Sequence, residues 1–185
     1  DMLPTKGKVH VDNWEVSKLP KSKIHELRRK VGMVFQDFKV LHDRTVFENV
    51  ALGLEILGKK EAEIQKDVVG VLGLVGLGDK TLRFPQELSA GELQRTSIAR
   101  AIAGGPKILL ADEPTGNLDP VTSMEILDIL GEVNKIGTTV VMATHNADIV
   151  NHFKKRTIMM EEGSIVSDEE KGQYRIAKTE RKKRS

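Results

Sequence analysis

The stretch Ile108-Leu109-Leu110-Ala111-Asp112-Glu113-Pro114 decides the fold, because an apolar run ends here in two adjacent carboxylates. Such a run is typical of a buried strand in a parallel sheet. Ligands of open α/β sheets bind beyond the carboxyl ends of the strands, so Asp112 and Glu113 are expected beside a ligand. Taken alone, a polar turn at the end of a strand is the more common explanation.

Two further apolar runs end in side chains that suit phosphate chemistry. Residues 31–35 lead into Gln36, and residues 140–144 lead into His145. A glutamine can ligate Mg²⁺ or hold an attacking water, and a histidine can donate a hydrogen bond to a γ-phosphate oxygen. A lone histidine at a strand end is more often solvated. The convergence of three strand ends reverses those odds and favours a magnesium nucleotide, with Asp112 near the metal and Glu113 activating water.

The surrounding pattern predicts an α/β core with an inserted helical subdomain. After Leu88 the order helix, strand, helix, strand implies parallel strands joined by crossover helices. We expect strands at 9–11, 31–35, 108–111 and 138–143, the last two buried, helices at 21–30, 89–103 and 119–135, and a hairpin of 157–160 with 164–166. The insert begins with the capping-box pair Thr45 and Glu48 and contains two helices up to Val75. One domain is predicted, with a core of 1–42 and 87–166, a helical subdomain of 43–86, and a polar basic tail of 167–185.

A second phosphate-binding feature is predicted at Leu88-Ser89-Ala90-Gly91-Glu92. Ser89 and Glu92 have the spacing of a capping box at the start of a helix. The first turn of a helix has unpaired N–H groups that attract anions, and Gly91 lets a phosphate approach the backbone closely. A well-capped helix without a ligand has the same pattern, so this segment alone is ambiguous.

Composition excludes several classes of protein. The 185 residues are 39% hydrophobic, which suits one globular domain, and the net charge of +2 does not indicate a nucleic-acid partner. Cysteine is absent, which excludes disulfides and thiolate metal sites and favours a reducing compartment. The sequence contains neither an apolar run long enough to span a bilayer nor a signal segment. Because Asp1-Met2-Leu3-Pro4 enters a strand without a preceding element, we expect that the sequence is truncated at its N-terminus.

Together these segments resemble the ATP-binding cassette (ABC) ATPases, which have a P-loop NTPase-like fold. Five of the six motifs of that family occur in order: the Q-loop at Gln36, the signature at 88–92, Walker B at 108–113, the D-loop at 117–119 and the H-loop at His145. The similarity extends to about Val166. No Gly-x-x-x-x-Gly-Lys-Ser/Thr Walker A loop occurs in the sequence. We expect that the complete protein has this loop and that the chain without it hydrolyses little ATP.

The resemblance implies ATP and Mg²⁺ as cofactors and a head-to-tail homodimer. Asp112 and Gln36 would hold the metal, Glu113 would be the catalytic base, and His145 would contact the γ-phosphate. The signature residues would face the nucleotide of the partner subunit; they are Leu88, Ser89, Ala90, Gly91 and Glu92. Asp119 would link the two sites. Ala90 and Glu92 depart from the usual LSGGQ signature, and this departure is expected at most to weaken the phosphate contact.

Within the family, residues 34–50 are most similar to the ATP-binding proteins of cell division. This similarity implies an integral membrane partner, docked in a groove beside Gln36 and the helical insert, and a peripheral position on the cytoplasmic face of the plasma membrane. Two alternatives stay open: an ATPase of a lipoprotein-release or macrolide exporter, and an inactive scaffold for a membrane protein. A chromosome-maintenance ATPase would need long heptad helices, for which the insert is too short. The basic tail could contact anionic lipid, although solvation is more common.

Overall fold

The computed structural model describes residues 4–172 and divides into two compact units, which meet in sequence between Ala143 and Thr144. This boundary falls within the segment predicted to be continuous α/β core. The first unit contains the sheet and the helical insert, and the second contains a short helix and a hairpin.

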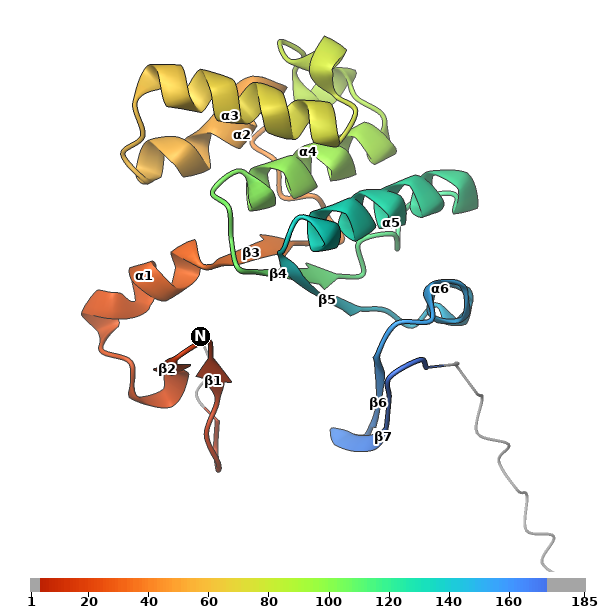
Figure 1. Ribbon diagram of the computed structural model, residues 1–185. Helices are drawn as coiled ribbons and strands as arrows, with labels where there is room; N and C mark the ends of the chain where they lie inside the picture. Colours follow the sequence, from red (N-terminus) through yellow and green to blue (C-terminus); the bar gives the residue numbers. More distant parts are fainter. Residues whose placement is uncertain (1–3, 173–185) are drawn as a thin grey trace, which may run out of the picture. The chain divides into compact units, whose positions relative to one another are not determined.

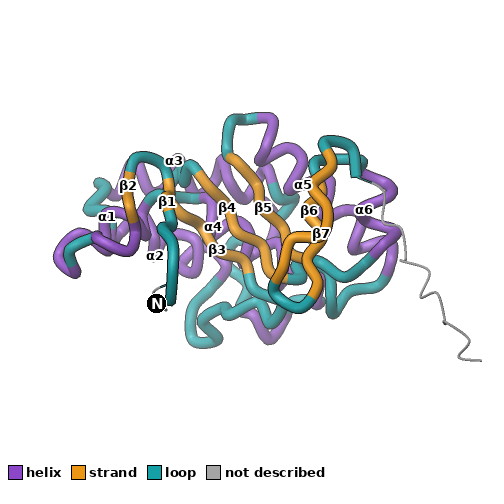
Figure 2. Tube along the Cα trace, turned by 90° about the horizontal axis from the view of Figure 1, so that it is seen from below, coloured by secondary structure: helices purple, strands orange, loops and turns teal. Residues whose placement is uncertain are grey.

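Three parallel strands form the centre of the first unit. They are β3 (Val31–Val34), β4 (Ile108–Asp112) and β5 (Thr139–Ala143), in the order β3-β4-β5. Val34 lies opposite Ala111, and Asp112 lies opposite Ala143. Figure 2 shows the three strands side by side with helices behind them. The predicted α/β core with parallel strands is therefore confirmed.

Helices α4 (Ala90–Ile102) and α5 (Pro120–Lys135) lie along one face of this sheet (Figure 1). On that face Val34, Leu109 and Ala111 are buried, whereas Met33 and Val141 on the opposite face are 47% and 53% exposed. Residues 139–143 form the predicted strand β5, but the prediction that this strand is buried is wrong. Among the described strands β5 lies at the edge of its sheet, and exposed positions alternate along it. An apolar run alone cannot distinguish an edge strand from a central one.

The helical insert consists of α2 (Val46–Ile56) and α3 (Glu61–Leu74), followed by the short 3₁₀ turns η3 (Gly78–Lys80) and η4 (Pro85–Glu87). The predicted capping box is confirmed: the Thr45 N–H donates to Glu48 Oε2 at 2.7 Å, and the Glu48 N–H donates to Thr45 Oγ1 at 3.3 Å. Each helix begins where a side chain satisfies a backbone donor that has no partner within the helix.

The core of the insert lies where α2 packs against α3 and α4 (Figure 1). Its side chains follow the helical period that the sequence predicts, and those with 1% exposure or less include Val46, Val50, Leu54, Val68, Leu72 and Ile98. Burial of one such side chain stabilises the fold by about 1.5–3 kcal/mol. The insert is thus joined to the sheet through α4, the helix that begins at the predicted signature.

An antiparallel hairpin of β1 (His10–Val11) and β2 (Trp14–Glu15) precedes the sheet. The sequence reading identified only the first of these strands. Between them Asp12 has a positive φ of 54°, and its carboxylate accepts hydrogen bonds from Lys30 Nζ at 2.9 Å and Lys107 Nζ at 3.1 Å. The hairpin leads through η1 (Val16–Lys18) to the helix predicted at 21–30, which is the 3₁₀ turn η2 (Lys21–Lys23) continued by α1 (Ile24–Arg29).

The second unit contains α6 (Ala147–Phe153) and the hairpin of β6 (Thr157–Glu161) with β7 (Ser164–Glu169). The hairpin was predicted, and its turn residues Glu162 and Gly163 both have positive φ, which matches the twist of the strands. β7 extends three residues beyond the predicted strand, into the segment assigned to the tail. The basic residues 178–184 of that tail lie outside the described residues.

Candidate functional site

The predicted metal and base residues lie at one edge of the sheet. Gln36 follows β3 by two residues, Asp112 is the last residue of β4, and Glu113 comes next. Because β3 and β4 are parallel and adjacent, their carboxyl ends are at the same edge. The structure thus brings three of the four predicted catalytic and metal-binding residues to that edge.

His145, the fourth, belongs to the second unit. It is exposed, lies two residues beyond β5 in the sequence, and precedes Asn146, whose side chain caps α6 by accepting from the Asp148 N–H at 2.9 Å. Its proximity to Glu113 therefore stays a prediction.

Glu113 occupies a left-handed turn with a φ of 44°. Its N–H donates to the Ala143 carbonyl at 3.0 Å, and its own carbonyl accepts from the Gly116 N–H at 3.0 Å. Left-handed backbone in a residue other than glycine is costly and persists where the surrounding structure enforces it, often at functional sites. The turn places the half-buried Glu113 immediately beyond the strand.

Gln36 is joined by two hydrogen bonds to the loop that follows Glu113. Gln36 Nε2 donates to Asn117 Oδ1 at 3.4 Å, and Asn117 Nδ2 donates to the Gln36 carbonyl at 3.2 Å. Gly116 makes this approach possible, because a Cβ at that position would lie 2.8 Å from Gln36 Nε2. The side-chain nitrogen of Gln36 donates to Asn117, so the side-chain oxygen of Gln36 is the atom that can face a cation.

These residues suit a nucleotide-bound Mg²⁺ better than a metal held by protein alone. Asp112 is an exposed carboxylate and Gln36 offers an amide oxygen, both of which are hard oxygen ligands. Within residues 4–172, no group of three or more His, Asp or Glu side chains could hold a metal ion. Mg²⁺ commonly binds through one or two protein oxygens together with water and phosphate, so this ligand set fits it.

The predicted signature segment begins α4 as expected. The Ser89 N–H donates to Glu92 Oε2 at 2.8 Å, and the Glu92 N–H donates to Ser89 Oγ at 3.3 Å. The Ser89 N–H lowers the pKa of Glu92, with smaller contributions from the Ser89 hydroxyl and from Lys80, whose Nζ lies 3.5 Å from Glu92 Oε1. The departure from glutamine at this position thus provides an ionised cap, while Ser89 and Ala90 are exposed and Leu88 is half-buried.

Gly91 packs against α5, and its predicted contact with a phosphate stays a prediction. A Cβ at Gly91 would lie 2.5 Å from Thr122 Cγ2 on α5, and Gly91 itself is buried. The glycine therefore allows the first turns of α4 and α5 to pack closely. Close approach of a phosphate is not needed to explain why this position lacks a side chain.

Asp119 caps α5. Its Oδ1 accepts from the N–H groups of Val121 at 3.0 Å and Thr122 at 3.1 Å, and its Oδ2 accepts from the Thr122 hydroxyl at 2.5 Å. The hydrogen bond from the Thr122 hydroxyl is the largest cause that lowers the pKa of Asp119, followed by that from the Thr122 N–H. The residue predicted to link two sites thus orients the helix against which Gly91 packs.

We expect Asp119→Asn to make the free energy of unfolding fall less steeply than in wild type as the pH is lowered. A carboxylate with a lowered folded pKa contributes stability above its unfolded pKa of about 3.9, and this contribution is lost as the pH falls through the folded pKa. The measurement is urea unfolding from pH 7 to pH 2. Asp148→Asn is the matched control, because Asp148 is not the N-cap residue of its helix. An equally steep fall in wild type and Asp119→Asn would contradict the prediction.

Sequence reasoning missed two residues that connect to this edge of the sheet. Asn117 was identified only as part of a motif, and its pairing with Gln36 spans 81 positions. Gln94 was not identified, although it lies in register with Gly91, Ile98 and Ile102 on the buried side of α4. A polar side chain on the apolar stripe of a helix is the signal that could have found it.

Comparisons with known proteins show the family to which this chain belongs. A sequence model described as "ABC transporter" matches residues 1–116. The cell division ATP-binding protein FtsE of Bacillus subtilis is 53% identical over 92% of this chain and 75% of the relative, and that of Mycobacterium tuberculosis is 48% identical over 92% and 74%. The methionine import ATP-binding protein MetN of Carboxydothermus hydrogenoformans is also 48% identical, over 89% of this chain but only 49% of the relative.

Two solved structures share the fold. The ATP-binding cassette MJ0796, a dimer in a post-hydrolysis state bound to ADP and Pi, superposes with a TM-score of 0.80 and 34% identity and covers 92% of this chain and 76% of that chain. CbiO1 of Clostridium perfringens, part of an ABC transporter complex, has a TM-score of 0.84 and 30% identity, with 91% and 68% covered.

Proposed function

Since this chain belongs to the ABC transporter family, we propose that the complete protein is the ATP-hydrolysing subunit of a membrane complex in cell division, the FtsE partner of an FtsX-like protein. The observation that carries this proposal is the placement of Gln36, Asp112 and Glu113 at the carboxyl ends of adjacent parallel strands. The extent and identity of the match to FtsE proteins support the cell-division role.

In this proposal the edge residues divide the work of ATP hydrolysis. Asp112 and the amide oxygen of Gln36 would hold Mg²⁺, which would offset negative charge on the phosphates. Glu113 accepts a proton from the water that attacks the γ-phosphate, and its left-handed turn places the residue immediately beyond the end of β4. The predicted hydrogen bond from His145 to a γ-phosphate oxygen stays an expectation, because His145 belongs to the second unit.

The signature residues complete the site of a second copy in a head-to-tail homodimer. The first turns of α4 and α5 pack together through Gly91 and Thr122. Ser89 and Asp119 are the N-cap residues of these two helices, so both lie next to this contact. The first-turn amides of α4 suit a phosphate. Support for the dimer comes from the family member MJ0796, which is dimeric in its ADP and Pi complex.

Phosphate release by the purified complete protein tests the enzymatic part of this proposal. Residues 1–185 contain no Walker A loop, whose backbone amides cradle the phosphates in P-loop enzymes, so we expect little turnover from this segment alone. The complete protein is expected to hydrolyse ATP with a dependence on Mg²⁺. A complete protein that binds ATP but releases no phosphate, with or without its membrane partner, would favour the scaffold alternative.

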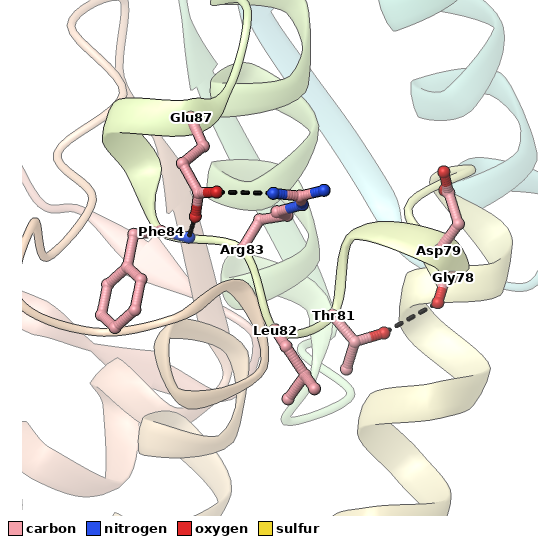
Figure 3. A pocket seen from close by; sticks show the side chains of 7 residues that line it. All are labelled: Gly78, Asp79, Thr81, Leu82, Arg83, Phe84 and Glu87. Atoms are coloured by element: carbon pink, nitrogen blue, oxygen red, sulfur yellow. Dashed lines mark hydrogen bonds and ion pairs between the residues drawn. The ribbon is translucent and has the colours of Figure 1, made fainter.

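The helical insert carries a candidate docking surface for the membrane partner. A pocket of about 480 Å³ is lined by Gly78, Asp79, Thr81, Leu82, Arg83, Phe84 and Glu87. Leu82 is 80% exposed and Phe84 is 43% exposed. Figure 3 shows both side chains directed away from the ion pair in which Arg83 Nη1 contacts Glu87 Oε1 at 2.7 Å. An exposed apolar pair beside a fixed ion pair suits an amphipathic segment of a partner.

This surface would hold the protein at the cytoplasmic face of the plasma membrane. None of the described helices is long and apolar enough to cross a bilayer. We propose that the protein attaches to the membrane through its partner.

We expect Leu82→Asp combined with Phe84→Asp to abolish co-purification with an FtsX-type partner while ATP hydrolysis in detergent-free solution stays within about twofold of wild type. The two introduced carboxylates would be buried where a partner helix makes its apolar contact, and this burial is costly. Affinity purification from co-expressing cells measures the loss, and Ile136→Asp, at a position that is 69% exposed outside the insert, is the matched control. Retained co-purification of the double variant would show that the partner docks elsewhere.

A transporter role is the second candidate, because the methionine import protein MetN and the FtsE protein of Mycobacterium tuberculosis are both 48% identical to this chain. Co-purification with the membrane subunit of an importer or a lipoprotein or macrolide exporter, in place of an FtsX-type protein, would favour it.

A further inference from the structure

Gln94 connects the signature helix to the loop that carries Glu113. It lies on α4, its side chain is fully buried, and its Nε2 donates to the Pro114 carbonyl at 2.7 Å. Its Oε1 is also buried and accepts no hydrogen bond from the described residues. A buried amide with one partner is unusual, because polar groups in a protein interior are generally paired. The hydrogen bond that the Gln94 side chain does make ends on the Pro114 carbonyl.

The Pro114 carbonyl belongs to the turn that holds Glu113 in its left-handed conformation. The N–H of Glu113 is bound to Ala143, and its carbonyl is bound to Gly116. Proline has no N–H, so its carbonyl is the polar backbone atom through which Pro114 can be held. Gln94 provides that contact from a different element, and a left-handed residue such as Glu113 persists where the surrounding structure holds it.

The other end of this connection is the signature turn. Gln94 follows Ser89 by five residues on the same chain, and the helix start is fixed to α5 by the close contact of Gly91 with Thr122. In the proposed dimer, Ser89 contacts the nucleotide of the partner subunit, whereas Glu113 acts on the nucleotide of its own subunit. The Gln94 hydrogen bond links α4 to the residue that follows Glu113.

We propose that Gln94 is a positioning residue for Glu113 and that it couples the seating of α4 on one nucleotide to hydrolysis of the other. This inference rests on the proposed function. Gln94 contacts neither substrate nor metal in this scheme, and it acts through the Pro114 carbonyl. Its removal should therefore slow the chemical step and leave ATP binding intact.

The test compares Gln94→Met with Thr96→Val in the complete protein. Methionine keeps the length and flexibility of glutamine but removes the amide. Thr96 is a matched control, because it is also fully buried on α4 and donates one hydrogen bond to a backbone carbonyl, that of Glu92, at 2.8 Å. That bond stays within its own helix and does not reach the Glu113 turn.

Steady-state ATP hydrolysis, binding of a fluorescent ATP analogue and thermal unfolding are measured for both variants and for Glu113→Gln. We expect Gln94→Met to lower kcat by about tenfold or more, with KM and analogue affinity within about twofold of wild type, because small misplacements of catalytic groups are costly. Thr96→Val is expected to retain the wild-type kcat, although its unfolding temperature falls at least as much as that of Gln94→Met.

The possible outcomes separate this inference from the proposed function. A wild-type kcat for Gln94→Met with a strongly reduced kcat for Glu113→Gln overturns the role of Gln94 and leaves that of Glu113. Equal losses of kcat in Gln94→Met and Thr96→Val also overturn it, because they indicate only weakened packing. Wild-type activity in Glu113→Gln removes the proposed function itself.

Discussion

Glu113→Gln is expected to lower kcat for ATP hydrolysis by about a hundredfold or more, because a general base contributes roughly 10²–10⁴ to a rate. The amide has nearly the shape of the carboxylate but cannot accept a proton from water. The left-handed turn at Glu113 is built from backbone contacts with Ala143 and Gly116, which the substitution does not remove. Binding of the fluorescent ATP analogue should therefore persist while phosphate release is lost.

Steady-state phosphate release by the complete protein measures this effect. The matched control is Glu55→Gln, an exposed position on α2 where the same chemical change is made away from the sheet edge. Equal rates for wild type and Glu113→Gln would remove Glu113 from the mechanism. If those rates were equal and negligible, a scaffold that docks a membrane protein would become the better description.

Asn49→Leu is expected to destabilise the protein by about 3 kcal/mol, because several buried polar groups lose their partner together. Asn49 is fully buried on α2. Its Nδ2 lies 3.0 Å from the Leu41 carbonyl, 3.1 Å from the Arg44 carbonyl and 2.9 Å from the Thr45 carbonyl, and its Oδ1 accepts from the Leu41 N–H at 2.8 Å. Leucine has similar volume but satisfies none of these groups.

Denaturant unfolding measures the loss, and Asn134→Leu is the control. Asn134 makes a single exposed hydrogen bond to the Thr138 carbonyl at 3.0 Å, so its replacement should cost less than about 1 kcal/mol. Similar midpoints for the two variants would show that the Asn49 network contributes little. A large loss would show that one side chain stabilises the loop between Gln36 and α2.

The sequence was sufficient for features that depend on neighbouring residues or on a short period. The capping boxes at Thr45 and Ser89 join residues three apart, and the hairpin turn depends on Glu162 and Gly163. The parallel direction of β4 and β5 follows from the alternation of strands with helices after Leu88. These predictions hold because the energies that decide them act within a few residues.

Other features needed the packed structure. The strand β2 has only two residues and gives little periodic signal, and α6 was missed although Asn146 is a recognisable cap. The exposure of β5 depends on which strands pair with it, and the sequence of one strand does not contain that information.

By itself, the sequence determined the order of the motifs, the parallel α/β class and the residue types at the strand ends, because strand and helix periods and caps are local properties. Only the tertiary structure decided that Gln36 pairs with Asn117, that Gly91 receives Thr122, and that Gln94 binds the Pro114 carbonyl. These contacts join residues between 20 and 81 positions apart. Their partners are set by how helices pack on the sheet, which depends on the whole core and on no single segment.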